Sequence, residues 1–150
     1  MKPSEITVLL VEDDSIDVMN VQRAFNKNNI TYPLHVAHNG IEALNLLRGT
    51  NGKPKMPLPK VILLDINMPK MNGIEFLTEL RNDPELKSLI VFILTTSNDE
   101  QDKFEAFNHH VAGYILKPLS FEKFVNAIAI LNNYWKICET PELIEKSVKL

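Results

Sequence analysis

The chain contains a single cysteine, Cys138, among its 150 residues, which excludes a disulfide within the chain. No run approaches the roughly 20 apolar residues that a membrane-spanning helix needs. The 16 basic and 19 acidic residues give a formal charge of −3, so no basic field favours nucleic acid or an anionic membrane as a partner. The first residues, Met-Lys-Pro-Ser-Glu, lack the apolar stretch of a secretory signal. These absences predict a cytoplasmic protein that binds neither nucleic acid nor membrane.

The length and the 45% hydrophobic content fit one compact domain. We expect this domain to cover residues 1–134 and to be followed by a tail, 135–150, with one short helix near 141–145. A DNA-binding output domain would need several more helices, and the tail is too short to hold them.

Short, continuously apolar runs predict strands that are covered by helices on both faces of a sheet. Such runs occupy residues 6–11, 61–64, 90–94 and 114–116, with a weaker run at 34–38. The segments between them, including a polar one at 99–108, predict helices. Caps are expected at Asn39, at Ser97 or Asn98, and at Ser120, and Pro84 is expected to stop the third helix. This alternation predicts an α/β fold, in which a doubly wound, five-stranded parallel sheet forms the middle of a three-layer sandwich.

Polar residues that could bind a metal ion or take part in a reaction lie at the ends of four of the predicted strands. Glu12 and Asp13 follow the first strand, Asp65 the third, Thr95 ends the fourth and Lys117 follows the fifth. Because the carboxyl ends of parallel strands form the ligand-binding edge of such a sheet, we expect these side chains to converge.

Converging carboxylates require a compensating cation. Two unit charges 4 Å apart repel by about 1 kcal/mol in water and about 4 kcal/mol at an effective dielectric of 20. Lys117 supplies one positive charge, and an oxygen-only ligand set suits Mg²⁺ for the remainder. Asp65 could then act as a nucleophile toward a phosphoryl group, with Thr95 donating its hydroxyl to a phosphate oxygen.

Each of these residues also has a structural interpretation. Acids after a strand commonly cap the next helix, and this interpretation is preferred for Asp14 and Asp17. Asp65 could open a turn before Met68-Pro69, and Lys117 could simply end a strand. Only the joint occurrence of these residues at successive strand ends favours a functional site.

The motifs LLVEDD, LLDINMPKMNG, FILTTS and GYILKPL resemble, in this order, the receiver domain of two-component response regulators, which includes the bacterial chemotaxis regulator. The resemblance covers about Glu5 to Tyr134. It implies a flavodoxin-like sheet of order 2-1-3-4-5, and a signalling module rather than an enzyme, with Asp65 phosphorylated by a sensor histidine kinase or a histidine phosphotransfer protein. The basic loop 48–60 and the tail resemble the stand-alone regulators associated with bacterial phytochromes.

The same resemblance implies a role for each site residue. Mg²⁺ would be bound directly by Asp13 and Asp65, through water by Glu12, and by the backbone carbonyl of Asn67. The residues that contact the phosphoryl oxygens or form the conformational switch would be Thr95, Thr96, Lys117 and Tyr114. The lifetime of the phosphoryl group would be tuned by Asn67 and Ser97. A cis Lys117-Pro118 peptide is also implied and is physically admissible.

The leading interpretation is a single-domain response regulator that signals by protein–protein contact. The contact face would combine helix 99–108, strand 114–116 and the helix that starts at residue 121; a homodimer is also allowed. Trp135 would bury either in such a dimer or on its own domain. The basic loop 48–60 could dock a kinase, but a solvated segment is the preferred interpretation. Two alternatives are a phosphate-independent adaptor and a haloacid-dehalogenase-like phosphohydrolase, although the latter carries an acid where this chain has Asn67.

Overall fold

The computed structural model describes residues 6–117 and 120–139. Five parallel strands alternate with five helices, which confirms the predicted fold class. The strands are β1 (Val8–Val11), β2 (Leu34–Ala37), β3 (Val61–Leu64), β4 (Val91–Thr95) and β5 (Gly113–Leu116). The helices are α1 (Ser15–Lys27), α2 (Gly40–Arg48), α3 (Gly73–Asn82), α4 (Glu100–Asn108) and α5 (Phe121–Ile137). The sheet order is β2-β1-β3-β4-β5, as the resemblance implies.

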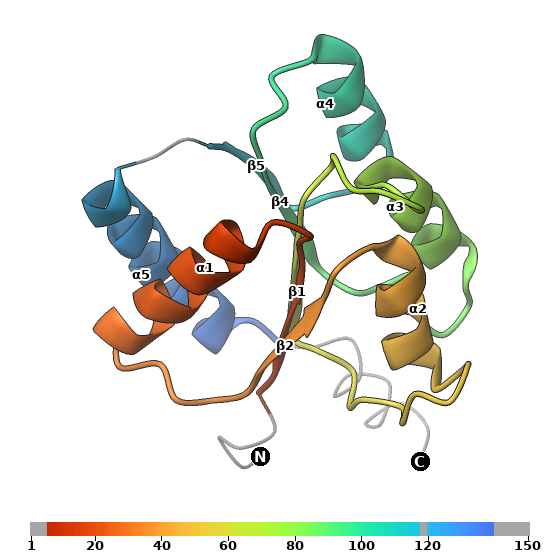
Figure 1. Cartoon of the computed structure of the whole chain (residues 1–150), viewed down its shortest axis with the longest axis horizontal. Helices are drawn as coiled ribbons and strands as arrows, with labels where there is room; N and C mark the ends of the chain where they lie inside the picture. Colours follow the sequence, from red (N-terminus) through yellow and green to blue (C-terminus); the bar gives the residue numbers. More distant parts are fainter. Residues whose placement is uncertain (1–5, 118–119, 140–150) are drawn as a thin grey trace.

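The helices cover both faces of the sheet and make three layers. Helices α1 and α5 lie on one side, while α2, α3 and α4 lie on the other (Figure 1). Alternate residues of each strand point to opposite faces, so β1 sends Leu9 and Val11 into the core under α2 and α3, and Val8 and Leu10 into the core under α1 and α5. Burial on both faces explains why the strands read as continuous apolar runs.

The register of the central strands aligns the residues that follow them. Val11 pairs with both Ala37 and Leu64, so Glu12 and Asp65 are the first residues beyond neighbouring strand ends. The Asp65 N–H donates to the Val11 carbonyl at 3.0 Å, which extends the ladder by one bond. The two acids are therefore fixed side by side by backbone hydrogen bonds.

The helix starts agree with the predicted caps at Asn39 and Ser120, and α3 ends at Asn82, before Pro84. The cap predicted for the fourth helix is wrong. Asp99 is the N-cap of α4, and its carboxylate accepts the Asp102 N–H at 3.0 Å. Ser97 lies two residues before this cap, and its hydroxyl instead donates to the Asp102 carboxylate at 2.6 Å.

Helix α5 runs past residue 134 and carries Trp135 into the core. The indole is 2% exposed, and its N–H donates to the Tyr32 hydroxyl and to the Asn132 side-chain oxygen. Of the two predicted environments for Trp135, the structure shows packing on its own domain. The division at residue 134 stays a prediction, and the short helix predicted near 141–145 lies outside the described residues.

The loop between α2 and β3 is only partly solvated, so that expectation is wrong in part. Met56 is 5% exposed and Lys60 6% exposed, because the chain re-enters the sheet here and the Lys60 N–H donates to the Thr7 carbonyl. Lys53 and Lys55 are exposed. Over residues 6–117 and 120–139, no helix has both the length and the apolar character required to span a membrane.

Candidate functional site

Three carboxylates converge at the carboxyl ends of β1 and β3. One oxygen each from Glu12, Asp13 and Asp65 can be chosen so that all three lie within 4.8 Å of one another. Glu12 is 2% exposed and Asp65 7% exposed, whereas Asp13 is open to solvent. The Asp65 Oδ1 accepts the Ile66 N–H at 2.8 Å, which orients this carboxyl group. The structure thus brings the predicted acidic residues together.

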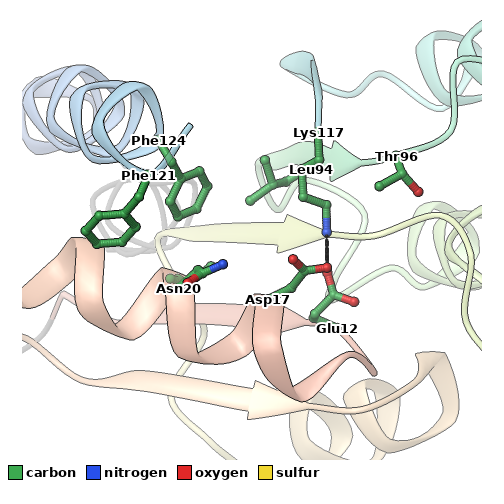
Figure 2. Close-up of a pocket in the computed structure, with 9 residues that line it drawn as sticks. Glu12, Asp17, Asn20, Leu94, Thr96, Lys117, Phe121 and Phe124 are labelled. Atoms are coloured by element: carbon green, nitrogen blue, oxygen red, sulfur yellow. Dashed lines mark hydrogen bonds and ion pairs between the residues drawn. The ribbon is translucent and has the colours of Figure 1, made fainter. Parts of the chain in front are cut away.

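Lys117, from the end of β5, reaches across this edge and contacts two acids. Its Nζ donates to Glu12 Oε1 at 2.8 Å and to Asp17 Oδ2 at 2.8 Å, and its side chain is 10% exposed. Figure 2 shows the lysine pointing toward Glu12, which follows β1, and toward Asp17, which lies in α1. The predicted meeting of Lys117 with the acidic cluster is confirmed.

The sequence interpretation missed one contact of the cluster, the ion pair between Asp17 and Lys117. Asp14 is the N-cap of α1, as predicted, and accepts the N–H groups of Ile16 and Asp17. Asp17 lies in the first turn of α1, as the helix-terminus interpretation predicts, and its carboxylate also pairs with Lys117. A signal was present in the spacing, because Asp17 begins the stripe that continues with the buried Val21 and Ala24.

The charges of this cluster depend on one another. Burial raises the pKa of Glu12 to about 7, although the hydrogen bond and charge of Lys117 oppose this shift. Burial by itself would lower the pKa of Lys117, but the hydrogen bonds to Asp17 and Glu12 outweigh it, and the pKa is raised. Lys117 is therefore charged at neutral pH, while a second cation near Glu12 would favour its ionised form.

The oxygen cluster fits a small hard cation. Mg²⁺ binds oxygen at about 2.0–2.1 Å, which places two oxygens on one ion about 3–4 Å apart. The 4.8 Å limit of the cluster is slightly wider, so small side-chain movements or a bridging water would complete the coordination. Asn67 is exposed two residues after Asp65, and a metal-binding role for its carbonyl stays a prediction.

The predicted switch residues lie at the end of β4 and along β5. Thr95 is fully buried, and its hydroxyl oxygen accepts the Ser97 N–H at 3.3 Å. The Tyr114 hydroxyl donates to the Ser97 carbonyl at 2.8 Å, so this ring points inward toward the loop after β4. Thr96 is exposed and lines a cavity beside the site.

This cavity of about 180 Å³ lies between α1 and α5 and opens next to Lys117 (Figure 2). Its polar walls are Glu12, Asp17, Asn20, Thr96 and Lys117, and its apolar walls are Val21, Leu94, Phe121 and Phe124.

Gly73, the first residue of α3, packs directly on the backbone of the site. Its N–H donates to the Ile66 carbonyl at 2.8 Å. A Cβ at this position would lie 2.4 Å from the Asp65 carbonyl oxygen and 2.9 Å from the Ile66 Cα. The absence of a side chain at Gly73 therefore sets how closely α3 approaches Asp65.

Comparison with known proteins identifies the family. Residues 8–129 match the response regulator receiver domain, and the chain belongs to this family. It is 35% identical over 128 residues to the probable methanogenesis regulatory protein FilR2 of Methanothrix harundinacea, covering 85% of this chain and 82% of that protein. It is 32% identical over 128 residues to response regulator Rcp1 of Synechocystis, covering 85% and 87%.

Solved structures of phytochrome regulators are also similar. The phosphorylated cyanobacterial phytochrome response regulator RcpA aligns with a TM-score of 0.79 and 30% identity, covering 91% of this chain and 98% of that one. The Mn²⁺-bound form of Rcp1 aligns with a TM-score of 0.78 and 30% identity, covering 91% and 99%.

The family resemblance drawn from the four motifs is thereby confirmed, and with it a non-enzymatic signalling class. The acidic triad of Glu12, Asp13 and Asp65 is typical of a receiver. Receiver domains partner with histidine kinases.

Proposed function

We propose that this protein is a single-domain response regulator that accepts a phosphoryl group on Asp65 from a sensor histidine kinase or a histidine phosphotransfer protein. The observation that carries the proposal is the convergence of the Glu12, Asp13 and Asp65 carboxylates with Lys117 at one edge of the sheet. This chain covers 98–99% of the RcpA and Rcp1 structures, so the likeness extends over nearly the whole of those regulators. The single cysteine fits the reducing cytoplasm, where we place this reaction.

The reaction is a transfer between two side chains. An oxygen of the Asp65 carboxylate attacks phosphorus, the new O–P bond forms, and the N–P bond of the donor phosphohistidine breaks. The imidazole nitrogen keeps the bonding electron pair, and Asp65 becomes an acyl phosphate. No other bond changes, so the protein contributes position and electrostatic stabilisation.

The metal in this proposal is Mg²⁺, held by the carboxylates of Asp13 and Asp65, by Glu12 through water and by the Asn67 carbonyl. When bound, it would offset the negative charge of the phosphoryl oxygens. The solved Mn²⁺-bound form of the relative Rcp1 supports a divalent cation of this type. Lys117 supplies the remaining positive charge.

We assign roles toward the phosphoryl group to four more residues near this edge of the sheet. The hydroxyl groups of Thr95 and Thr96 would donate hydrogen bonds to phosphoryl oxygens. For Thr95, this requires that the side chain rotates away from the Ser97 N–H. Asn67 lies two residues after the acceptor, and Ser97 lies two residues after Thr95. Both would set how easily water reaches the phosphoryl group.

The output is a protein–protein contact through the face of α4, β5 and α5. Tyr114 connects this face to the site, because its hydroxyl bonds the Ser97 carbonyl while its ring centroid lies 6.3 Å from that of Phe107. Large apolar side chains are exposed on all three elements, among them Phe104, Phe107, Leu116 and Ile130. A downstream protein is the proposed occupant, and a homodimer through the same face is the alternative.

The proposal is tested by intact-mass analysis after incubation with acetyl phosphate and Mg²⁺. The unmutated chain should gain one phosphoryl group, Asp65→Ala should gain none, and Asp13→Ala should be labelled poorly because metal binding is lost. Asp14→Asn is the matched control and should label normally, since Asn also caps a helix. Full labelling of Asp65→Ala would place the acceptor elsewhere.

A further inference from the structure

Lys117 is shared between an acid of the proposed phosphoryl site and an acid outside it. Its Nζ lies 2.8 Å from an oxygen of Glu12 and 2.8 Å from an oxygen of Asp17. With both acids ionised, one ammonium group faces two carboxylates, so this trio carries a net negative charge. The positive charge of the lysine is therefore largely neutralised before any phosphoryl group arrives.

Asp17 is fixed where it holds the lysine toward α1. It lies in the first turn of α1, and its side chain is 30% exposed, whereas the neighbouring acid Asp14 is exposed and caps the helix. Asp17 does not belong to the carboxylate cluster of Glu12, Asp13 and Asp65. Figure 2 shows that Lys117 extends down from its strand end toward α1 to reach it.

We propose that Asp17 is a positioning residue that holds Lys117 on the α1 side of the site in the resting protein and competes with a phosphoryl group on Asp65 for this lysine. This inference rests on the proposed function. It goes further, because it assigns to Asp17 an effect on the free-energy difference between the resting and the phosphorylated conformation. A contact shifts this equilibrium only if it is stronger in one conformation than in the other, and the Asp17–Lys117 contact would form only in the resting one.

The surroundings allow the lysine to exchange partners. The cavity of about 180 Å³ is lined by Lys117, Asp17 and Glu12, so side chains do not enclose the lysine on every side. Glu12 remains within reach of the lysine in either position, since it belongs both to the acidic cluster and to the ion pair. Loss of the Asp17 contact is therefore the main electrostatic cost of the exchange.

The experiment measures binding of beryllofluoride, a phosphoryl mimic, at saturating Mg²⁺ by isothermal titration calorimetry. Asp17→Asn keeps the shape of the side chain and removes its charge. A partly exposed ion pair contributes up to about 1 kcal/mol, so this variant should bind beryllofluoride about two- to fivefold more tightly than the unmutated protein. Asp17→Ser, a second neutral variant, should bind equally tightly.

Two controls separate the contact from general charge. Asp14→Asn removes the same charge a few residues away while keeping an N-cap, and should have a smaller effect because exposed charge is screened by salt. Asp17→Glu restores a carboxylate and should return the affinity toward that of the unmutated protein.

The outcomes are distinguishable. Equal or weaker binding by Asp17→Asn, an equal gain in Asp14→Asn, or a persisting gain in Asp17→Glu would each overturn the role of Asp17 while leaving phosphorylation intact. If the unmutated protein neither binds beryllofluoride nor is labelled by acetyl phosphate, the proposed function itself fails, and this inference fails with it.

Discussion

Replacing Gly73 by alanine should destabilise the protein, although alanine normally favours a helix. Gly73 is the first residue of α3 after the N-cap Asn72, and removing a glycine from a helix stabilises it by up to about 1 kcal/mol. Here the added Cβ would lie 2.4 Å from the Asp65 carbonyl oxygen and 2.9 Å from the Ile66 Cα. Both are backbone atoms, so the β3–α3 connection must move, at a typical cost of about 1–3 kcal/mol for overpacking. A net loss of about 1–2 kcal/mol is expected.

Gly40→Ala is the matched control for this substitution. Gly40 is also the first residue of its helix after an asparagine N-cap. Its added Cβ would meet Met71 at Cγ (2.6 Å) and Sδ (2.8 Å), which belong to a flexible side chain that can turn away. We therefore expect Gly40→Ala to lower the free energy of unfolding by less than about 1 kcal/mol.

Urea unfolding followed by circular dichroism gives the free energies, and acetyl phosphate labelling gives the effect on the site. Gly73→Ala should lower the urea midpoint more than Gly40→Ala and should also slow labelling, because Asp65 itself is displaced. If Gly73→Ala were as stable as the unmutated protein, or no worse than Gly40→Ala, the argument that α3 packs against the acceptor backbone would be refuted.

Three further predictions concern other parts of the fold and site. Trp135→Ala should lower the free energy of unfolding by about 3–5 kcal/mol in urea titrations, because the indole is buried; a loss no larger than that of the half-exposed Tyr134→Ala would contradict its packing. In metal-free protein, the pKa of Glu12 is about 7 and exceeds its unfolded value. The folded state therefore binds more protons between pH 4.5 and about 7, so the free energy of unfolding should fall as pH rises through this window, by about 1–3 kcal/mol. Glu12→Gln should flatten this dependence, and an unchanged slope would exclude Glu12 as its source. Tyr114→Phe removes the hydrogen bond to the Ser97 carbonyl and should lower the free energy of unfolding by about 0.5–1.5 kcal/mol while leaving acetyl phosphate labelling intact; lost labelling would show that the hydroxyl acts in the transfer itself.

The fold was predictable because its strands are buried on both faces. Continuous apolar runs identify such strands, and parallel connections put all their carboxyl ends at one edge. Glu12, Asp65 and Lys117 could therefore be assigned to one site from the sequence alone. Strand boundaries shifted by only one or two residues, as in β5, which begins at Gly113.

The contacts that were missed depend on the direction of individual side chains. Asp17 fits a helix-terminal acid in sequence, and only the packing of α1 against the sheet turns it toward Lys117. Asp99 rather than Ser97 caps α4 because the chain leaves β4 through a longer loop than its residue types indicate. The sequence is compatible with two environments for Trp135, because it does not show that Tyr32, which is distant in sequence, accepts a hydrogen bond from the indole.

The central claim, that Asp65 accepts the phosphoryl group, is tested most directly by mapping the modified residue. Protein labelled with acetyl phosphate and Mg²⁺ is reduced with borohydride, which converts an aspartyl phosphate to homoserine, and is then digested and sequenced by mass spectrometry. The account predicts homoserine at position 65 and nowhere else. Homoserine at Asp13 or Asp14, or a phosphoryl group retained on a serine, threonine or histidine with position 65 unchanged, would contradict it.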